Sequence, residues 1–288
     1  MTLKQALGSA RGLLAANGIA DAALESELLL RHALKVSRVQ LYQNLNQELR
    51  PEQEADFWQI IKRRLSHEPT AYITGHTEFY GLDFYVDQRA LIPRPESELL
   101  VEEALKFTGE HPARENLLIA EVGTGSGAIA VTLALNLPQS KIYAIDVSTG
   151  ALEVAAINCQ KYRVENRVQL ISGDLLEPLS EPVDLIVANL PYIRDSEIEE
   201  LSPEIKFFEP RIALAGGEDG LDKIRQLCRQ TVNRLRRGGC LLIEIGLEQG
   251  EHVTTYLRNL FPSARVEVMP DLSGIDRVVC LRLTQNLP

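Results

Sequence analysis

The chain has 288 residues, of which 45% are hydrophobic and 24% charged, as is ordinary for a soluble globular protein of one large or two smaller domains. Its net charge of −10 argues against a duplex nucleic-acid partner, which requires a basic surface, and no apolar run reaches membrane length. Cys159, Cys228, Cys240 and Cys280 are too scattered for a metal site, which favours buried free thiols in a reducing compartment.

Residues 1–68 have the apolar spacing of amphipathic helices. The first stretch lacks acids and carries two basic residues, as a transit peptide does, but its regular apolar stripe favours an ordinary helix. We therefore expect a cytoplasmic protein. The stripe consists of Leu3, Leu7, Ala10 and Leu14.

Three residues in this region mark where further helices begin. Asp21 and Ser37 are suited to cap two helices, and Pro51 suits the first turn of another. No glycine-rich loop or acid pair occurs before residue 69, so we expect no chemistry there.

Residues 69–96 form a connector. Thr77–Tyr80 and Phe84–Val86 have the composition of short strands around a glycine turn and predict a hairpin. Ile92–Glu96 contains too much proline for a helix or a central strand. This rigid segment either lines a cofactor site with Pro95 or Glu96 or only links two domains.

From Ser97 onward helices and strands alternate, which predicts an open α/β sheet. Gly238 and Gly239 are expected to end one helix and begin the fifth strand. The last two strands have no helix between them and are expected to pair antiparallel. The predicted strands are 117–122, 141–146, 168–171, 183–188, 240–245, 265–269 and 277–283, and the helices are 97–108, 127–136, 149–162, 219–236 and 247–260.

A glycine-rich turn follows the first of these strands. Gly123, Gly125 and Gly127 alternate between an apolar strand and an Ala/Leu helix, a unit typical of nucleotide-type cofactors. It is neither a phosphate loop, since no Lys-Ser/Thr follows, nor a Gly-x-Gly-x-x-Gly motif. Asp146 and Asp174 end the next two strands, where an acid can bind ribose hydroxyls or can simply cap a helix.

The strand Asp184–Ala188 is followed by Asn189-Leu-Pro-Tyr192. Asn189 supplies an amide oxygen, and Leu190 precedes a proline, which restricts the direction of its carbonyl. Tyr192 offers a flat face. Such a group can hold a planar –NH2 between two acceptors, although the same tetrapeptide also suits a plain turn.

Together these motifs resemble the class I S-adenosylmethionine-dependent methyltransferases that act on amino or amide nitrogen. The segments Ala71–Glu96 and Phe208–Leu221 are similar to the peptide chain release factor N5-glutamine methyltransferases, the PrmC/HemK family. The resemblance covers nearly the whole chain. One departure is Leu190, where the family has proline in Asn-Pro-Pro-Tyr.

The resemblance implies a Rossmann-like, seven-stranded α/β sheet with a small N-terminal helical domain. It implies a substrate-docking domain at 1–68, a connector at 69–96 and a methyltransferase domain at 97–288. The cofactor would be S-adenosylmethionine, leaving as S-adenosylhomocysteine. The implied cofactor residues are Gly123, Thr124, Gly125, Ser126, Gly127, Asp146, Asp174, Leu175 and Asn189, and the implied catalytic and substrate residues are Asn189, Leu190, Pro191 and Tyr192.

In this scheme the Asn189 side-chain oxygen and the Leu190 carbonyl accept the two hydrogens of a glutamine amide, while Tyr192 packs on the amide plane. That is positioning plus electrostatic stabilisation, with no metal. The partners implied are class I release factors, and we expect a monomer with neither a membrane nor a direct nucleic-acid partner.

Three alternatives stay open. Asn-Leu-Pro-Tyr as written is also similar to the motif of ribosomal RNA adenine N6-dimethyltransferases. The substrate could be a glutamine of a ribosomal protein, or the chain could be a non-catalytic binding module. The residues alone assign no role to Arg94-Pro-Glu96 or to Glu209-Pro-Arg211, and they do not say which release factor is methylated.

Overall fold

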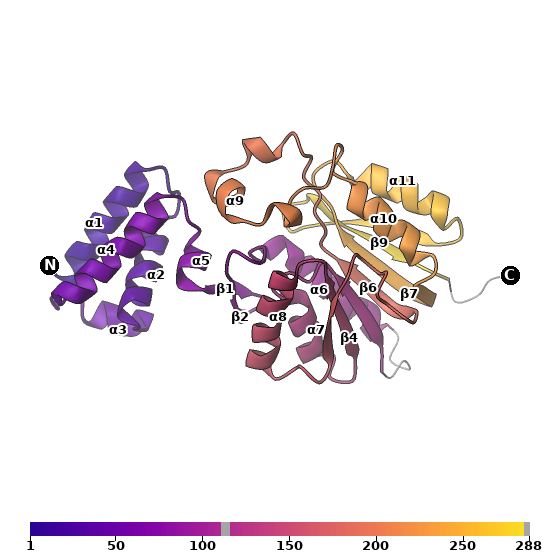
Figure 1. Ribbon diagram of the computed structural model, residues 1–288, viewed down its shortest axis with the longest axis horizontal. Helices are drawn as coiled ribbons and strands as arrows, with labels where there is room; N and C mark the ends of the chain where they lie inside the picture. Colours follow the sequence, from indigo (N-terminus) through magenta and orange to yellow (C-terminus); the bar gives the residue numbers. More distant parts are fainter. Residues whose placement is uncertain (111–115, 285–288) are drawn as a thin grey trace. The chain divides into compact units, whose positions relative to one another are not determined.

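The computed structural model describes residues 1–110 and 116–284, so the last four residues of the expected domain 97–288 lie outside the described part. The chain divides into two compact units (Figure 1). The first consists of Met1–His76 with Ser202–Phe208, and the second of Thr77–Leu201 with Glu209–Pro288.

The first unit is helical, as predicted, around a core that includes Phe57. Ser37 caps its helix as predicted, its hydroxyl accepting the Gln40 N–H at 3.2 Å. Asp21 stands at an N-cap, but its backbone is not extended (φ −94°, ψ 35°) and its side chain makes no capping bond, so that predicted cap is wrong. The helices are α1 (Leu3–Ala16), α2 (Ala22–Leu34), α3 (Arg38–Gln43), α4 (Pro51–Leu65), α5 (Thr70–Thr74) and α9 (Pro203–Phe208).

Arg64, at the end of α4, is buried inside this unit with its charge compensated. Its guanidinium pairs with Glu25 of α2 and, at 2.5 Å, with Glu204 of α9. The Thr70 hydroxyl donates to Glu25 at 2.8 Å. A buried guanidinium requires such partners, and the second carboxylate comes from a segment 140 residues away.

The second unit begins with the predicted hairpin, β1 (His76–Phe79) and β2 (Leu82–Tyr85). Tyr80 and Gly81 both have positive φ (52° and 69°), as a two-residue hairpin turn requires. The expectation that Ile92–Glu96 contains no helix is wrong at its end. Pro95–Ser97 forms one 3-10 turn, since a proline in the first turn needs no N–H partner.

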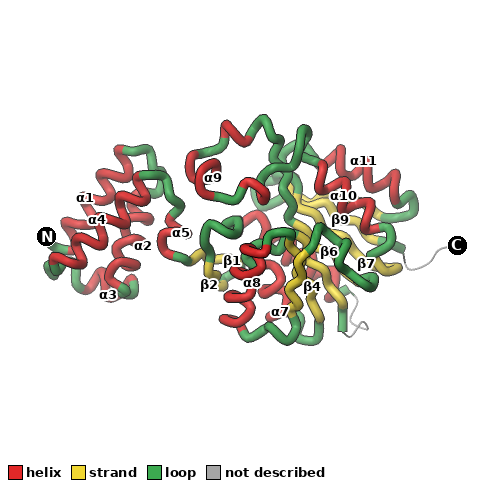
Figure 2. Tube along the Cα trace, viewed as in Figure 1, coloured by secondary structure: helices red, strands yellow, loops and turns green. Residues whose placement is uncertain are grey.

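The second unit contains a seven-stranded sheet, whose strands are yellow in Figure 2. The strand order is β5-β4-β3-β6-β7-β9-β8. Strands β3 to β7 are parallel, and β9 pairs antiparallel with both β7 and β8, which confirms the predicted final hairpin. The strands are β3 (Leu118–Val122), β4 (Lys141–Asp146), β5 (Val168–Ser172), β6 (Val183–Ala188), β7 (Leu235–Glu244), β8 (Arg265–Pro270) and β9 (Asp276–Arg282).

Helices cover both faces of this sheet, and each face has its own apolar core. Ile119 and Leu185 face one core with α6 and α7, whereas Ala120 and Ile186 face the other with α10 and α11. No helix within residues 1–110 and 116–284 is long and apolar enough to span a bilayer. The helices are α6 (Glu98–Gly109), α7 (Ala128–Asn136), α8 (Thr149–Tyr162), α10 (Asp222–Thr231) and α11 (Gly250–Leu260).

The predicted helix 219–236 is wrong at both ends. The helix covers only Asp222–Thr231, and β7 begins at Leu235, so the double glycine lies within the strand. Between Leu235 and Cys240 the strand bulges away from β6. Gly238 has φ 67°, and a Cβ on Gly239 would lie 2.7 Å from the Arg236 carbonyl oxygen. The glycines therefore permit a bulge and do not serve as a helix cap.

Candidate functional site

A cavity of about 260 Å³ opens at the carboxyl ends of the parallel strands. Its volume is close to that of the smaller pockets that bind small molecules in other proteins. Parallel strands bring their carboxyl ends to one edge of the sheet, so residues distant in sequence meet there. Of the sequence-predicted residues, ten line the cavity, whereas Gly127 and Tyr192 do not. The ten are Gly123, Thr124, Gly125, Ser126, Asp146, Asp174, Leu175, Asn189, Leu190 and Pro191.

The glycine loop between β3 and α7 forms the floor. A Cβ on Gly123 would lie 2.9 Å from the Asn189 carbonyl oxygen, so only glycine lets the two segments approach this closely. Gly127 stands at the N-cap of α7 with φ 78°, and a Cβ there would meet Ala155 of α8 at 3.1 Å. Gly127 therefore lets the end of the glycine loop pack closely against α8, although it does not line the cavity.

Asp146 is the last residue of β4 and is held by two backbone donors. Gly125 N–H donates to one carboxylate oxygen at 2.9 Å, and Ser148 N–H to the other at 2.8 Å. Burial raises the pKa of Asp146, and these two hydrogen bonds oppose the shift. Since each carboxylate oxygen can accept a second hydrogen bond, Asp146 fits a ligand with paired hydroxyls, such as a ribose.

Asp174 lies at the opposite wall in a more polar setting. Lys223 Nζ binds its two oxygens at 2.9 and 3.0 Å, and the Gln226 amide donates at 3.1 Å. Lys223 also lines the cavity. A ligand amine at this carboxylate has to share it with a lysine from α10.

Glu121, on β3, is a cavity residue to which the sequence motif assigned no role. It is 2% exposed, accepting from the Thr124 hydroxyl at 2.5 Å and the Ala130 N–H at 3.0 Å. Burial raises the pKa of Glu121 to about 8. Its carboxyl therefore holds the glycine loop and the first turn of α7 together as a hydrogen-bonded acid.

Asn189 begins a chain of side-chain hydrogen bonds that leads into the protein interior. Its Nδ2 donates to Ser97 Oγ at 2.9 Å, and Ser97 Oγ lies 2.6 Å from Glu244 Oε2. Tyr192 donates its hydroxyl to the other oxygen of Glu244 at 3.3 Å. Because Ser97 takes the amide nitrogen, the Asn189 oxygen is available to a ligand in the cavity.

Leu190 is buried, being 4% exposed, and packs in the core beside Gly123. Its Cδ2 would lie 3.3 Å from a Cβ on Gly123. Leu190 therefore contributes its side chain as well as its backbone carbonyl, since the side chain fills space beside the glycine loop.

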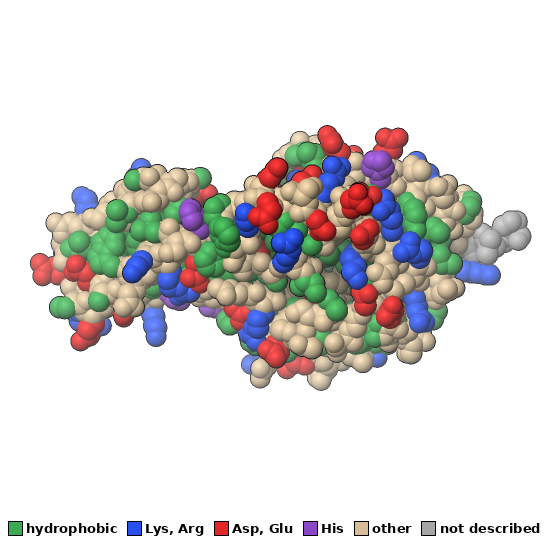
Figure 3. Space-filling view, turned by 45° about the horizontal axis from the view of Figure 1, so that its top comes forward, with side chains coloured by type: hydrophobic (Ala, Val, Ile, Leu, Met, Phe, Trp, Pro, Cys, Tyr) green, Lys and Arg blue, Asp and Glu red, His purple; other side chains and the backbone are tan. Residues whose placement is uncertain are grey.

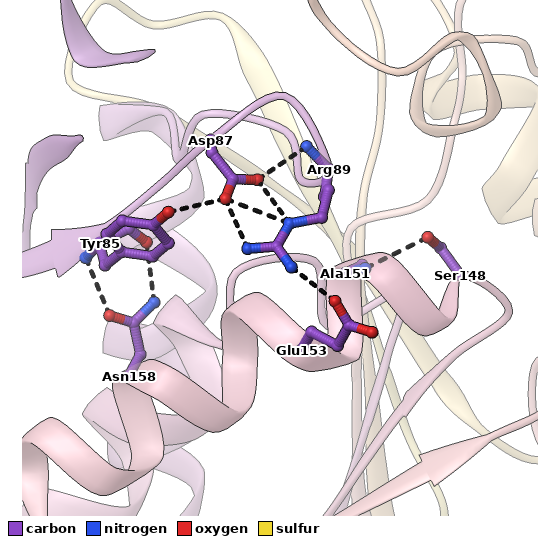
Figure 4. Close-up of polar contacts among 7 residues, drawn as sticks. All are labelled: Tyr85, Asp87, Arg89, Ser148, Ala151, Glu153 and Asn158. Carbon is purple, nitrogen blue, oxygen red and sulfur yellow. Dashed lines mark hydrogen bonds and ion pairs between the residues drawn. The ribbon is translucent and has the colours of Figure 1, made fainter. Parts of the chain in front are cut away.

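The connector supplies a further wall, including Arg89, Ala90, Leu91 and Pro93. Figure 4 shows how it is fixed to α8: Asn158 both accepts from Tyr85 N–H (2.8 Å) and donates to its carbonyl (2.9 Å). Arg89 binds Asp87 and reaches Glu153 of α8 at 2.5 Å. The bonds from Arg89 lower the pKa of Asp87 to about 2.

The two segments without an assigned role meet in this unit. Arg94 forms an ion pair with Glu209, whose side chain is 1% exposed. Pro210, Ile212 and Ala213, just beyond Glu209, line the cavity. The pair therefore ties the proline-rich connector to the loop that forms another wall.

The motifs missed several polar residues in or beside the cavity, among them Ser97, Glu121, Glu244 and Lys223. Arg94 belongs to the segment Ile92–Glu96, which the sequence singled out without giving the arginine a role. Glu244 had a usable signal, since it is the last residue of a parallel strand, as Asp146 is. Ser97 had none, because its partner Asn189 lies 92 residues away.

Comparison with known proteins gives two family matches. Residues 5–75 match the family described as PrmC N-terminal domain, and residues 97–206 match the family described as methyltransferase small domain. The second match contains the glycine loop, both strand-end aspartates and the Asn-Leu-Pro-Tyr segment.

Full-length relatives extend these matches. The release factor glutamine methyltransferase of Moorella thermoacetica is 44% identical over 96% of this chain and 97% of its own. That of Bacillus anthracis is 40% identical over 97% and 98%. Among solved structures, a methyltransferase from Pyrococcus furiosus covers 72% of this chain and 91% of its own with a TM-score of 0.53 at 17% identity, a likeness of fold.

Proposed function

The chain belongs to the release factor glutamine methyltransferases, and we propose that it methylates the side-chain amide nitrogen, N5, of a glutamine in a peptide chain release factor. It is an S-adenosylmethionine-dependent enzyme with a class I methyltransferase fold. The main observation that supports a nitrogen as the methyl acceptor is the orientation of Asn189. Its amide nitrogen binds Ser97, which leaves its amide oxygen to accept an N–H from a substrate in the cavity.

The cavity fits the cofactor through its glycine floor and its two acids. Bound S-adenosylmethionine supplies an electrophilic methyl group on sulfur. We assign the Gly123–Gly127 loop to the methionine and ribose portions, and Asp146 to the ribose hydroxyls. Asp174 and Leu175 would border the adenine, with Asp174 accepting from its amine alongside Lys223.

The chain's own part in the chemistry is to orient a weak nucleophile. The lone pair of an amide nitrogen is delocalised into its carbonyl, so it attacks poorly unless it is held in place. The Asn189 oxygen and the Leu190 carbonyl would accept its two hydrogens and offset the positive charge that develops as the nitrogen–carbon bond forms. Tyr192 does not itself line the cavity, so it would pack on the amide from outside the lining, with its hydroxyl anchored by Glu244.

Adenine in ribosomal RNA is the alternative suggested by Leu190, since its exocyclic amine has the same two hydrogens. The charge argues against it: the chain carries −10 overall, and acidic and basic side chains are interspersed on the face of the second unit seen in Figure 3. RNA binding generally requires a continuous basic surface. The buried Leu190 side chain has a packing role that is independent of the substrate.

We assign substrate docking to the N-terminal helices, on the grounds that they have their own core and none of their residues lines the cavity. The partner would be a class I release factor, bound by a monomer in the cytoplasm.

The test is to incubate the chain with radiolabelled S-adenosylmethionine and, separately, release factors, ribosomal proteins and ribosomal RNA. We expect label in a release factor, at a glutamine. Asn189→Ala should remove most of that turnover while cofactor affinity measured by calorimetry stays nearly unchanged. Label in RNA adenine and none in protein would overturn the proposal.

A further inference from the structure

The two ends of the Asn189 amide have nearly the same shape but opposite chemistry. The oxygen accepts a substrate N–H, whereas the NH2 repels it. A half-turn about the last side-chain bond exchanges the two ends, and a free asparagine would sample both orientations. A site that holds –NH2 by this oxygen therefore needs a second group that selects one orientation.

Ser97 is placed to make that selection. It is 3% exposed and has one hydroxyl proton. Glu244 Oε2, at 2.6 Å, is acceptor-only when ionised and takes this proton. Ser97 then has only lone pairs to offer Asn189, and it binds the NH2 at 2.9 Å.

We infer that Ser97 and Glu244 are positioning residues that fix the Asn189 amide with its oxygen toward the substrate nitrogen. The inference rests on the proposed function only in requiring a substrate that presents an –NH2 group to Asn189. The buried carboxylate of Glu244 sets the direction of these hydrogen bonds. Ser97 donates to Glu244, Asn189 donates to Ser97, and the substrate –NH2 donates to the Asn189 oxygen.

The charge on Glu244 decides this direction. Glu244 is 2% exposed, and burial raises its pKa, as does the nearby charge of Glu96. The hydrogen bonds from Ser97 and Tyr192 and the charge of Arg277 lower it. A protonated Glu244 could donate to Ser97, which would free the hydroxyl to donate to the Asn189 oxygen and favour the wrong orientation.

The main experiment measures kcat at saturating S-adenosylmethionine and release factor, together with cofactor affinity by calorimetry. Ser97→Ala should lower kcat by roughly tenfold or more, the effect of losing one buried hydrogen bond, with cofactor affinity within about twofold of wild type. Ser97→Thr keeps the hydroxyl and should recover most of the rate. Ser140→Ala changes a buried serine that precedes β4, at the end of that strand away from the cavity; it is the matched control and should change neither quantity.

A pH profile separates positioning from packing. Wild-type kcat should fall as the pH drops through the raised pKa of Glu244, whereas Glu244→Gln, which cannot ionise, should be slow throughout and lack that step. This variant also serves if Ser97→Ala does not fold.

Three outcomes would each overturn the inference. They are an unchanged kcat in Ser97→Ala, an equal loss of cofactor affinity and kcat in that variant, and a fall of kcat at low pH in Glu244→Gln that matches the fall in wild type. If wild type labels a substrate other than a release factor, the proposed function fails, and the same variants on that substrate still test Ser97.

Discussion

Asp146 and Asp174 are both carboxylates at the ends of parallel strands, yet their surroundings prepare them for different tasks. Asp146 is held by two backbone N–H groups, those of Gly125 and Ser148. Asp174 is bound by the flexible side chains of Lys223 and Gln226. A ligand gains more from the fixed acceptor, since no side-chain ordering has to be completed on binding.

Asp146→Ala should therefore weaken S-adenosylmethionine binding more than Asp174→Ala does. Loss of a charge-assisted acceptor costs roughly 1–3 kcal/mol, or about 5- to 150-fold in affinity. Calorimetric titration of both variants measures the difference in affinity. Asp146→Asn is the control, since asparagine keeps the shape of the aspartate side chain and removes only its charge. Equal affinities of wild type and Asp146→Ala would remove Asp146 from the cofactor site.

Glu121 gives the protein a pH dependence of stability with an unusual sign. Its pKa is about 8 in the folded protein, against about 4.3 in an unfolded chain. Between these values the folded state holds a proton that the unfolded state has lost, so the free energy of unfolding falls as pH rises through this window.

Glu121→Gln should remove this decrease in the free energy of unfolding with rising pH, because glutamine is uncharged at every pH tested. Its side-chain oxygen can still accept from Thr124 and Ala130. Thermal unfolding of both proteins from about pH 6 to about pH 9 tests this. The melting temperature of wild type should drop more than that of the variant. Parallel curves would show that Glu121 does not titrate in this range.

At the scale of elements, periodicity predicted every strand of the sheet but not where β7 begins. The apolar spacing of α10 and the double glycine suggested one helix up to residue 236 followed by a strand. The β-bulge at Leu235–Cys240 depends on pairing with β6, about fifty residues earlier. It also depends on a glycine at 239, since a Cβ there would lie 2.9 Å from the Asp184 carbonyl oxygen. Such tertiary contacts have no local sequence signal.

The site divides in the same way. Gly123, Asp146 and Asn189 were found because each follows a strand, and parallel strands end at one edge. Ser97 was missed because its role depends on Asn189 and Glu244, which are distant in sequence. The burial of Leu190 was missed because its neighbour Gly123 lies in the loop that follows another strand, β3.

The Arg94–Glu209 pair is the contact that joins two of the cavity walls, and breaking it should affect both stability and ligand affinity. Arg94→Ala leaves the buried carboxylate of Glu209 without its guanidinium partner, at a cost of about 1–3 kcal/mol. We expect a lower urea midpoint and weaker S-adenosylmethionine binding, because Pro210 and Ile212 lose their support. Arg211→Ala, at a neighbouring exposed position, is the control. If Arg94→Ala matches that control in both measurements, the pair has no role in the cavity.

At the scale of the whole molecule, the division of the chain does not follow the sequence. The first unit recruits Ser202–Phe208, which lies between cavity-lining segments in sequence: Pro191 precedes it and Pro210 follows it. The contact that holds this segment is Arg64, which is 2% exposed and forms ion pairs with both Glu25 and Glu204. Helix α9 is therefore held within the first unit by its ion pair with Arg64 of α4.

Glu204→Gln should separate recognition of the protein substrate from chemistry. The variant keeps the shape of α9 but weakens its attachment to Arg64, and because Glu204 is 38% exposed the cost should be only about 1 kcal/mol. We expect kcat/KM on an intact release factor to fall roughly fivefold, with no change on a short glutamine peptide or in S-adenosylmethionine affinity. Glu200→Gln, an exposed glutamate a few residues earlier, should be neutral on both substrates. If kcat/KM falls as much on the peptide as on the release factor, α9 supports the segment between Pro191 and Pro210 and the helical unit does not recognise the substrate.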